Sequence, residues 1–204
     1  MTRLDHILLG VPDLKSGVQA FEQATGVAPV YGGKHPGRGT ENALVSLGDG
    51  IYLELIAPQP KPDADTALTR RLAALAQPAL ITWAAQTDDI DTLHSRLLHA
   101  GFHPSPPTPG ARVTPNGARL EWTTLDTDVE TAPFFIQWSA STVHPSRTSP
   151  GGCALKSFEV EAPNAAELNR MLAAAQIGVT VKHSPRFRLR LVLRCGACET
   201  TFTT

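Results

Sequence analysis

Apolar and polar positions along this chain follow a pattern that recurs three times: one strand, one helix, then three strands. The clearest copy spans residues 4–58, a second runs from residue 80 to residue 140, and a third, shorter copy spans residues 154–204. An internal repeat of this size indicates a fold assembled from similar units. The pattern therefore predicts an α+β protein built from repeated βαβββ modules.

The first copy carries the clearest local signals. Residues 4–11 are apolar on both faces, as expected of a strand that is covered on both sides. Asp13 predicts the start of a helix, and Gly26 stands where a helix commonly ends. Residues 48–50, Gly-Asp-Gly, predict a hairpin between two strands. The Gly/Pro-rich residues 32–40 predict a loop.

The spacing of these signals predicts the organisation of the chain. Residues 1–145 should hold two paired modules, at residues 1–60 and 79–140, joined by a helical connection at residues 63–77. Residues 103–117 contain five prolines, which indicates a surface loop. Residues 141–152 are rich in Ser, Thr, Pro and Gly and should form a linker. The third module would occupy residues 153–204.

Superposing the copies on their helix caps identifies equivalent strand positions. Counting back seven residues from the cap reaches His6 in the first copy, Thr82 in the second and Ser157 in the third. On the closing strand of each module, Glu54 corresponds to Gln137. A cup formed by the two paired modules is therefore predicted to have His6, Glu54, Thr82 and Gln137 at its inward positions.

Composition narrows the classes of function. The chain has 204 residues, of which 42% are hydrophobic, and its 18 basic and 19 acidic residues give a net charge of −1. Such a balance provides no basic field suited to nucleic acid. No apolar run approaches the roughly 20 residues of a membrane helix. The first residues lack a signal-peptide core. We therefore expect a cytoplasmic protein with neither nucleic acid nor a membrane as partner.

Cysteine usage and motif searches remove further classes. Three cysteines, an odd number, argue against a disulfide framework and for a reducing compartment. The pair Cys195 and Cys198 has C-x-x-C spacing, but with no second such pair it is predicted to flank a hairpin turn. The chain contains neither a G-x-S-x-G nucleophile elbow nor a Walker-type phosphate loop. Serine hydrolase and P-loop functions therefore have little support.

Several stretches together resemble the vicinal oxygen chelate superfamily, and within it the glyoxalase-like domain proteins. The most specific are residues 4–14, 35–43, 47–58 and 133–138, followed by residues 150–153. The resemblance implies paired βαβββ modules that form a curved mixed sheet around a site, with helices outside. It also implies a site that often holds a divalent metal ion, whose ligands come from the first and last strands of each module.

The implied metal positions match His6 and Glu54 in the first module, but they fall on Thr82 and Gln137 in the second. Gln137 could add a carbonyl oxygen and His35 could swing in from its loop, so a metal site with this incomplete set stays open. Without a metal, a hydrogen bond between His6 and Glu54 would satisfy the buried carboxylate. That pair could form a polar pocket or be purely structural.

The loop at residues 32–40 has two readings. His35 and Arg38 could clamp a carboxylate or phosphate, because the planar guanidinium of arginine binds an oxyanion through two atoms. Alternatively, the glycines only make turns in an ordinary surface loop. In the functional reading, His35, Arg38, Gln137 and Thr82 contact the ligand.

If the protein is an enzyme, the resemblance implies proton transfer, isomerisation, lyase or ring-cleaving dioxygenase chemistry on a small oxygenated, acidic molecule. Glu54 would be the general base, and His6 or a metal ion would stabilise the developing oxyanion. The alternative is a non-catalytic protein that binds a small-molecule ligand, as resistance proteins do. The third module lacks an obvious partner within the chain, so it should extend the sheet or form a homodimer interface.

Overall fold

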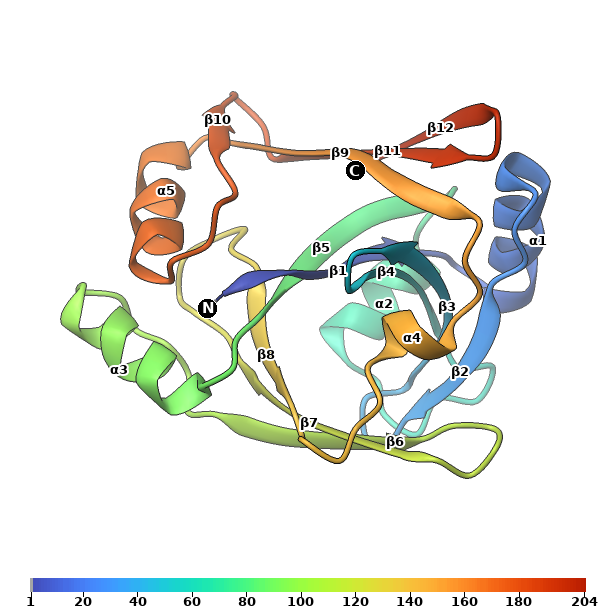
Figure 1. Cartoon of the computed structure of the whole chain (residues 1–204), viewed down its shortest axis with the longest axis horizontal. Helices are drawn as coiled ribbons and strands as arrows, with labels where there is room; N and C mark the ends of the chain where they lie inside the picture. Colours follow the sequence, from blue (N-terminus) through green and yellow to red (C-terminus); the bar gives the residue numbers. More distant parts are fainter. Residues whose placement is uncertain (1) are drawn as a thin grey trace.

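A computed structural model describes residues 2–204 of the chain (Figure 1). The elements occur in three successive groups of strand, helix and three strands, with short helices between the groups. Their bounds, in chain order, are β1 (Arg3–Gly10), α1 (Leu14–Thr25), β2 (Val30–His35), β3 (Thr40–Gly48), β4 (Ile51–Pro58), α2 (Ala67–Ala73), β5 (Ala79–Gln86), α3 (Ile90–His99), β6 (Thr108–Val113), β7 (Arg119–Leu125), β8 (Phe134–Trp138), α4 (Pro145–Thr148), β9 (Cys153–Ala162), α5 (Ala165–Ala174), β10 (Val181–His183), β11 (Arg188–Cys195) and β12 (Cys198–Thr203).

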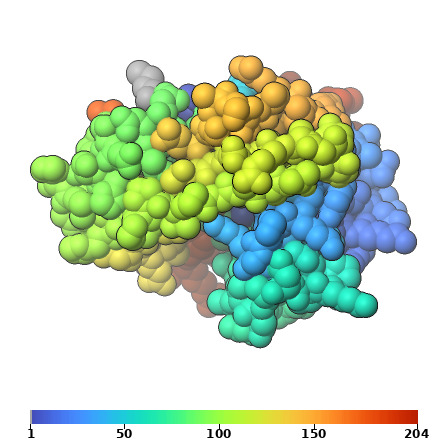
Figure 2. All heavy atoms as spheres, turned by 90° about the horizontal axis from the view of Figure 1, so that it is seen from below, coloured from blue at the N-terminus to red at the C-terminus, as the bar shows by residue number. Residues whose placement is uncertain are grey.

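The first two groups share one mixed sheet of eight strands in the order β2-β3-β4-β1-β5-β8-β7-β6. Strand β1 joins the groups, because it pairs in parallel with β4 and antiparallel with β5. The sheet curls until its two edge strands approach each other, where the Arg112 side chain of β6 donates a hydrogen bond to the Gly32 carbonyl of β2. Figure 2 shows this face, with the yellow-green β6–β7 hairpin beside the blue β2 segment. The predicted α+β fold with a curved mixed sheet is confirmed.

The third group forms a separate four-stranded sheet in the order β10-β9-β11-β12. The sequence showed no obvious partner for this group within the chain and predicted that it extends the first sheet. That prediction is wrong. Its apolar side chains, such as Val160, Leu168 and Leu191, join the same buried cluster as Ile7 and Trp83 of the eight-stranded sheet. The convex side of the curved sheet is thereby covered within one chain. A role of this group in a homodimer stays a prediction.

Helix caps follow the sequence signals closely. The Asp13 side chain accepts a hydrogen bond from the Ser16 amide, and Gly26 takes the left-handed conformation that ends α1. Asp89 caps α3 in the same way. These caps fix where α1 begins after β1 and where α3 begins after β5.

Three segments expected to be loops have regular structure. Residues 32–35 complete β2, and residues 108–113 form β6 despite the proline at position 109. Both strands lie at sheet edges, where proline is tolerated in β6. An edge also tolerates the register shift between Tyr31 and Gly33, where β2 pairs with β3. The expected linker at residues 141–152 contains α4, which packs against β3 and β4. Each segment reaches the concave side of the sheet.

Cysteine pairing also differs from expectation. Cys153 and Cys195 form a disulfide between the adjacent strands β9 and β11, which corrects the inference drawn from an odd cysteine count. Cys198 is free and exposed, and with Cys195 it flanks a hairpin turn as the C-x-x-C spacing predicts. No helix within residues 2–204 is long and apolar enough to cross a membrane.

Reduction of the Cys153–Cys195 disulfide should lower the stability of the protein. The bond closes a loop across a sequence separation of 42 residues, so its loss should cost about 4 kcal/mol through the entropy of the unfolded chain. The expected fall in melting temperature on adding dithiothreitol is roughly 8–16 °C. Cys198→Ser is the matched control and should leave the melting temperature of the oxidised protein unchanged. An identical melting temperature with and without reductant would show that the two cysteines are not bonded in solution.

Candidate functional site

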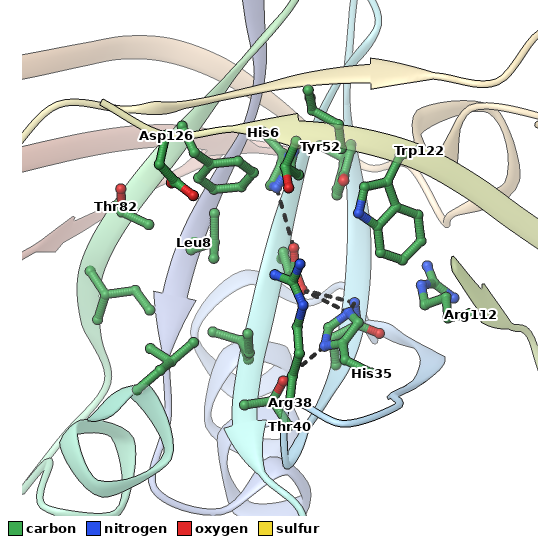
Figure 3. A pocket seen from close by; sticks show the side chains of 18 of the residues that line it. His6, Leu8, His35, Arg38, Thr40, Tyr52, Thr82, Arg112, Trp122 and Asp126 are labelled. Carbon is green, nitrogen blue, oxygen red and sulfur yellow. Dashed lines mark hydrogen bonds and ion pairs between the residues drawn. The ribbon is translucent and has the colours of Figure 1, made fainter. Parts of the chain in front are cut away.

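The concave side of the eight-stranded sheet encloses a cavity of about 220 Å³. Its lining divides into a polar half, which carries titratable and aromatic side chains, and an apolar half. Figure 3 shows Leu8 on one side of the cavity, with Thr82 and Asp126 near it, and Trp122 and Arg112 on the other side. The residues of the polar half are His6, His35, Arg38, Thr40, Asn42, Tyr52, Glu54, Arg112, Trp122, Thr124 and Trp138, and Thr82 and Asp126 add polar groups on the side of Leu8.

A histidine–carboxylate pair lies at the centre of the polar half. The Nε2 atom of His6 on β1 is 3.4 Å from Oε2 of Glu54 on the neighbouring parallel strand β4. The other carboxylate oxygen, Oε1, accepts a hydrogen bond of 2.9 Å from the Asn42 side chain. Glu54 is only 6% exposed, so these contacts compensate for the loss of water around its charge. The His6 ring stacks on Tyr52 with 4.5 Å between ring centroids.

Asp5 holds the His6 ring through Nδ1, the ring nitrogen that does not face Glu54. The pairing of β1 with β5 shifts register between Leu4 and His6, and this irregularity brings the Asp5 and His6 side chains together. Oδ1 of Asp5 is 2.5 Å from His6 Nδ1, and Oδ2 accepts hydrogen bonds from Trp138 Nε1 at 3.1 Å and His144 Nε2 at 3.0 Å. The ring of His144 accepts the Ser146 amide hydrogen through Nδ1, so its Nε2 carries the proton donated to Asp5.

The pKa of Asp5 is lowered to about 2 by these contacts. Complete burial of the carboxyl would raise it, but the hydrogen bonds and charges of His144 and His6 outweigh that effect. Asp5 is therefore ionised at neutral pH. An ionised acceptor at Nδ1 keeps a proton on that nitrogen of His6 and leaves Nε2 facing Glu54 and the cavity.

His35 forms the second histidine contact of Glu54. Its Nε2 is 3.7 Å from Glu54 Oε1, and its Nδ1 is 2.9 Å from the Thr40 hydroxyl. Burial lowers the pKa of His35, and the attraction of Glu54 opposes this only in part. A neutral His35 can accept a hydrogen bond from a ligand or from Asn42, whose amide nitrogen lies 3.3 Å from Nε2.

The turn that carries Arg38 is anchored by a carboxylate from the segment before α2. Asp63 accepts hydrogen bonds of 2.8 Å from the amides of both Gly37 and Gly39. Hydrogen bonding by the Gly37 amide is the main reason why the pKa of Asp63 is lowered. The anchor holds the exposed Arg38 at the mouth of the cavity.

Gly39→Ala should destabilise this turn and displace Arg38. Gly39 has φ +67°, and an added Cβ would clash with the Ala64 carbonyl oxygen. We expect a loss of about 2 kcal/mol and a fall in melting temperature of roughly 4–8 °C. Gly37→Ala is the matched control, because Gly37 has φ +69° but open space around its Cβ position, and it should cost only about 1 kcal/mol. Equal losses for both variants would contradict the close approach to Ala64.

Aliphatic side chains and one aromatic ring form the apolar half of the cavity. Leu8, Ile56, Ile81 and Leu72 make a small buried cluster on the concave side, distinct from the main core on the convex side. Leu72 comes from α2, which closes this end of the cavity. Leu68 and Phe134 pack against the cluster and line the cavity. A ligand is thus offered a polar end and an apolar end.

The predicted site residues are only partly brought together. His6, Glu54, Thr82, His35 and Arg38 all line the cavity.

Gln137 does not line this cavity: its Oε1 accepts a hydrogen bond from the Ile90 amide at the start of α3. Side chains alternate along a strand, and in β8 it is Phe134, Ile136 and Trp138 that face the cavity. The pairings of β1 with β4 and of β5 with β8 make Phe134 the equivalent of Glu54, so the predicted match with Gln137 is wrong by three residues. Glu121 also lies outside the cavity and pairs with Arg119 at the surface.

Other residues of the site were missed from the sequence. They are Asp5, Asn42, Tyr52, Arg112, Trp138 and His144, which hold or surround the His6–Glu54 pair. A signal was present for Asp5, because a carboxylate inside an otherwise apolar strand needs a partner. Leu4 and Ile7 both face the main core although they are three positions apart. The alternation of inward and outward side chains along β1 therefore shifts by one residue between them.

The side chains of the cavity do not fit a metal ion. Within residues 2–204, no group of three or more His, Cys, Asp and Glu side chains is placed to hold one. The two oxygens of Glu54 face different histidines, and Asn42 already donates to one of them. The second group adds Thr82, Ile136 and Trp138, which are not the histidine or carboxylate ligands that divalent metals prefer. It also adds one carboxylate, Asp126, on the side of the cavity opposite Arg112 (Figure 3).

Comparison with solved structures identifies similar folds. A hypothetical protein from Staphylococcus aureus matches with a TM-score of 0.67 and 16% sequence identity, over 100% of this chain and 85% of that chain. Methylmalonyl-CoA epimerase from Mycobacterium tuberculosis matches with a TM-score of 0.50 and 20% identity, over 66% and 85% of the two chains. A methylmalonyl-CoA epimerase in complex with methylmalonyl-CoA and NH4+ has a TM-score of 0.50 and 21% identity, over 69% and 97%.

These identities establish a shared fold and no more. A search of curated protein sequences found no match. The family model described as a glyoxalase-like domain matches residues 4–175, which is most of the chain. The chain therefore belongs to the glyoxalase-like domain family, within the vicinal oxygen chelate superfamily.

Proposed function

We propose that this protein is an acid–base enzyme that moves a proton at a carbon next to a carbonyl group in a small molecule. One observation carries the proposal: His6 lies between two carboxylates, with Nδ1 2.5 Å from Asp5 and Nε2 3.4 Å from Glu54 at the cavity wall. A base beside a nitrogen that can carry a proton is the arrangement that enolisation requires.

In the proposed reaction, a carboxylate oxygen of Glu54 takes the proton from the substrate carbon. The electron pair of the broken C–H bond moves into the carbonyl group, so negative charge develops on its oxygen. In its imidazolium form His6 donates Nδ1–H to Asp5 and can donate Nε2–H to that oxygen. Return of the proton from Glu54 to the same carbon gives exchange with solvent hydrogen, and its return to a second carbon of an enediolate or dienolate completes an isomerisation. Positioned general bases of this kind typically contribute about 10²- to 10⁴-fold.

Metal-assisted lyase and dioxygenase chemistry is not proposed. The reason is the donor set: His6 and His35 both contact Glu54, and Asp126, the carboxylate from the second group, forms no metal-binding group of three with them within residues 2–204. All proton handling in the proposal is assigned to residues of this chain.

The cavity limits the size of the substrate. A volume of about 220 Å³ lies below the roughly 300–1,000 Å³ of typical drug-sized sites, so it suits a small organic molecule. One structural neighbour is a methylmalonyl-CoA epimerase. A coenzyme A ester could place only its acyl end in this cavity, so we favour a small free acid with an apolar tail.

Binding without turnover is the second candidate function. It is favoured by the apolar half of the cavity, where Leu8, Ile56, Ile81 and Phe134 offer contacts but no chemistry. Such a protein would need neither the base nor the fixed tautomer of His6.

Deuterium exchange distinguishes the two functions. Wild-type protein would be incubated in D2O with a panel of small 2-oxo acids, 3-oxo acids and hydroxyketones, and loss of the proton next to the carbonyl would be followed by NMR. Exchange faster than the buffer rate, at one position of a preferred compound, is expected for the enzyme. Saturable binding of the same compounds without exchange would refute the enzyme and support the binding protein.

A further inference from the structure

Arg112 is a buried cation for which the protein provides no counter-ion. The residue is only 4% exposed, yet within residues 2–204 its guanidinium forms no ion pair and makes a single hydrogen bond, to the Gly32 carbonyl oxygen. Arginine stays protonated in proteins and has five N–H donors. A buried charge normally requires a partner of opposite charge.

The position of Arg112 rules out a simple solvent-facing role. It is on the edge strand β6 and lines the cavity at the junction with β2. The junction is tight, because a Cβ added to Gly33 would lie 2.7 Å from the Val113 carbonyl oxygen. Figure 3 shows Arg112 beside Trp122, on the side of the cavity away from Thr82 and Asp126.

The charges of the neighbouring side chains leave this cation uncompensated. Burial lowers the pKa of Arg112, and the opposing attraction of Glu54 is the largest favourable contribution. Glu54, however, is already shared among His6, His35 and Asn42. Its charge is therefore not available as a dedicated partner for the guanidinium.

We propose that Arg112 is the binding site for a carboxylate group of the ligand. The proposal rests on the proposed function and specifies its substrate class: a small carboxylic acid that also carries a carbonyl group. The guanidinium fork offers two parallel donors to a planar carboxylate. The cavity is small, and the lowered pKa of His35 favours its neutral form, so the site favours one carboxylate over a doubly charged phosphate.

With its carboxylate on Arg112, a substrate of this class places its carbonyl end towards Glu54 and His6, which line the same polar half. Arg38 stands at the mouth on its anchored turn and adds a second positive charge on the entry path. The aliphatic remainder of the molecule lies against Leu8 and Ile81. Polar groups thus fix the orientation, while the apolar wall accepts a short chain.

The test compares three probes by calorimetric titration: pyruvate, its neutral amide and inorganic phosphate. Wild-type protein should bind pyruvate at least about 10-fold more tightly than the amide, because charge-assisted hydrogen bonds are lost with the charge. Arg112→Gln should abolish that preference. Arg119→Gln is the control on the same hairpin, since Arg119 is exposed and paired with Glu121, and it should keep the preference.

Further results decide the proposal independently of catalysis. Arg112→Lys keeps the charge but loses the fork, and it should reduce the preference for pyruvate even if Arg112→Gln does not fold. Equal affinity of wild-type protein for acid and amide, or tighter binding of phosphate, would overturn the carboxylate site. Preference of the wild-type protein for the acid without deuterium exchange would refute the proposed function alone. Exchange of neutral ketones without any preference for acids would refute this inference alone.

Discussion

Replacing Glu54 by glutamine is expected to reduce the rate of proton exchange at least about 10³-fold while leaving the protein folded. The amide removes the only group in the cavity that both faces His6 Nε2 and can take a proton from carbon as a carboxylate. Its oxygen can still accept the hydrogen bond that Asn42 donates to Glu54, so the packing of β3 against β4 is preserved. The loss should therefore appear in turnover and not in stability.

The measurement is the initial rate of deuterium incorporation for wild type and variant, at equal protein concentration and with matched circular dichroism spectra. Glu121→Gln is the control, because it makes the same chemical change on a surface residue that lies outside the cavity. It should retain the full rate. If Glu54→Gln exchanged as fast as wild type, Glu54 would not be the base and the enzymatic proposal would fail.

Local signals in the sequence were sufficient for the fold of the first two units. The Asp13 cap, the Gly26 stop and the hairpin at residues 48–50 are decided by interactions within a few residues, and each is found as expected. Because these signals fix the bounds of β1 and β4, they also brought His6 and Glu54 to one sheet face. This part of the site could therefore be predicted.

The remainder of the site depends on contacts between distant residues. Arg112 lies in a proline-rich segment that forms a strand by pairing with β7, and its side chain meets β2 because the sheet curls. His144 comes from an expected linker and reaches Asp5 across 139 positions of the chain. No local periodicity reports such contacts. Gln137 shows the other difficulty, since a shift of an odd number of residues along a strand moves every side chain to the opposite face.

Asp5→Asn should impair both catalysis and stability, because Asp5 links Nδ1 of His6 to the side chains of Trp138 and His144. We expect the exchange rate to fall about 10³-fold, since an asparagine cannot fix the proton on Nδ1 of His6 as an ionised carboxylate does. The pH dependence of the rate should also change, which a merely structural role would not cause. His144→Gln removes one other partner of Asp5 without touching His6, and its rate should fall less than about 10-fold.

The stability effect of Asp5 has a definite sign and pH window. Its pKa falls from 3.8 to about 2 on folding, so the ionised carboxylate stabilises the folded state at all pH values above about 4. That contribution, about 2 kcal/mol, is lost as the pH falls through about 2. The free energy of unfolding of wild type minus that of Asp5→Asn should therefore decline between pH 4 and pH 2. A difference that stays constant over that range, together with an unchanged exchange rate, would show that Asp5 neither stabilises the fold by ionisation nor positions His6.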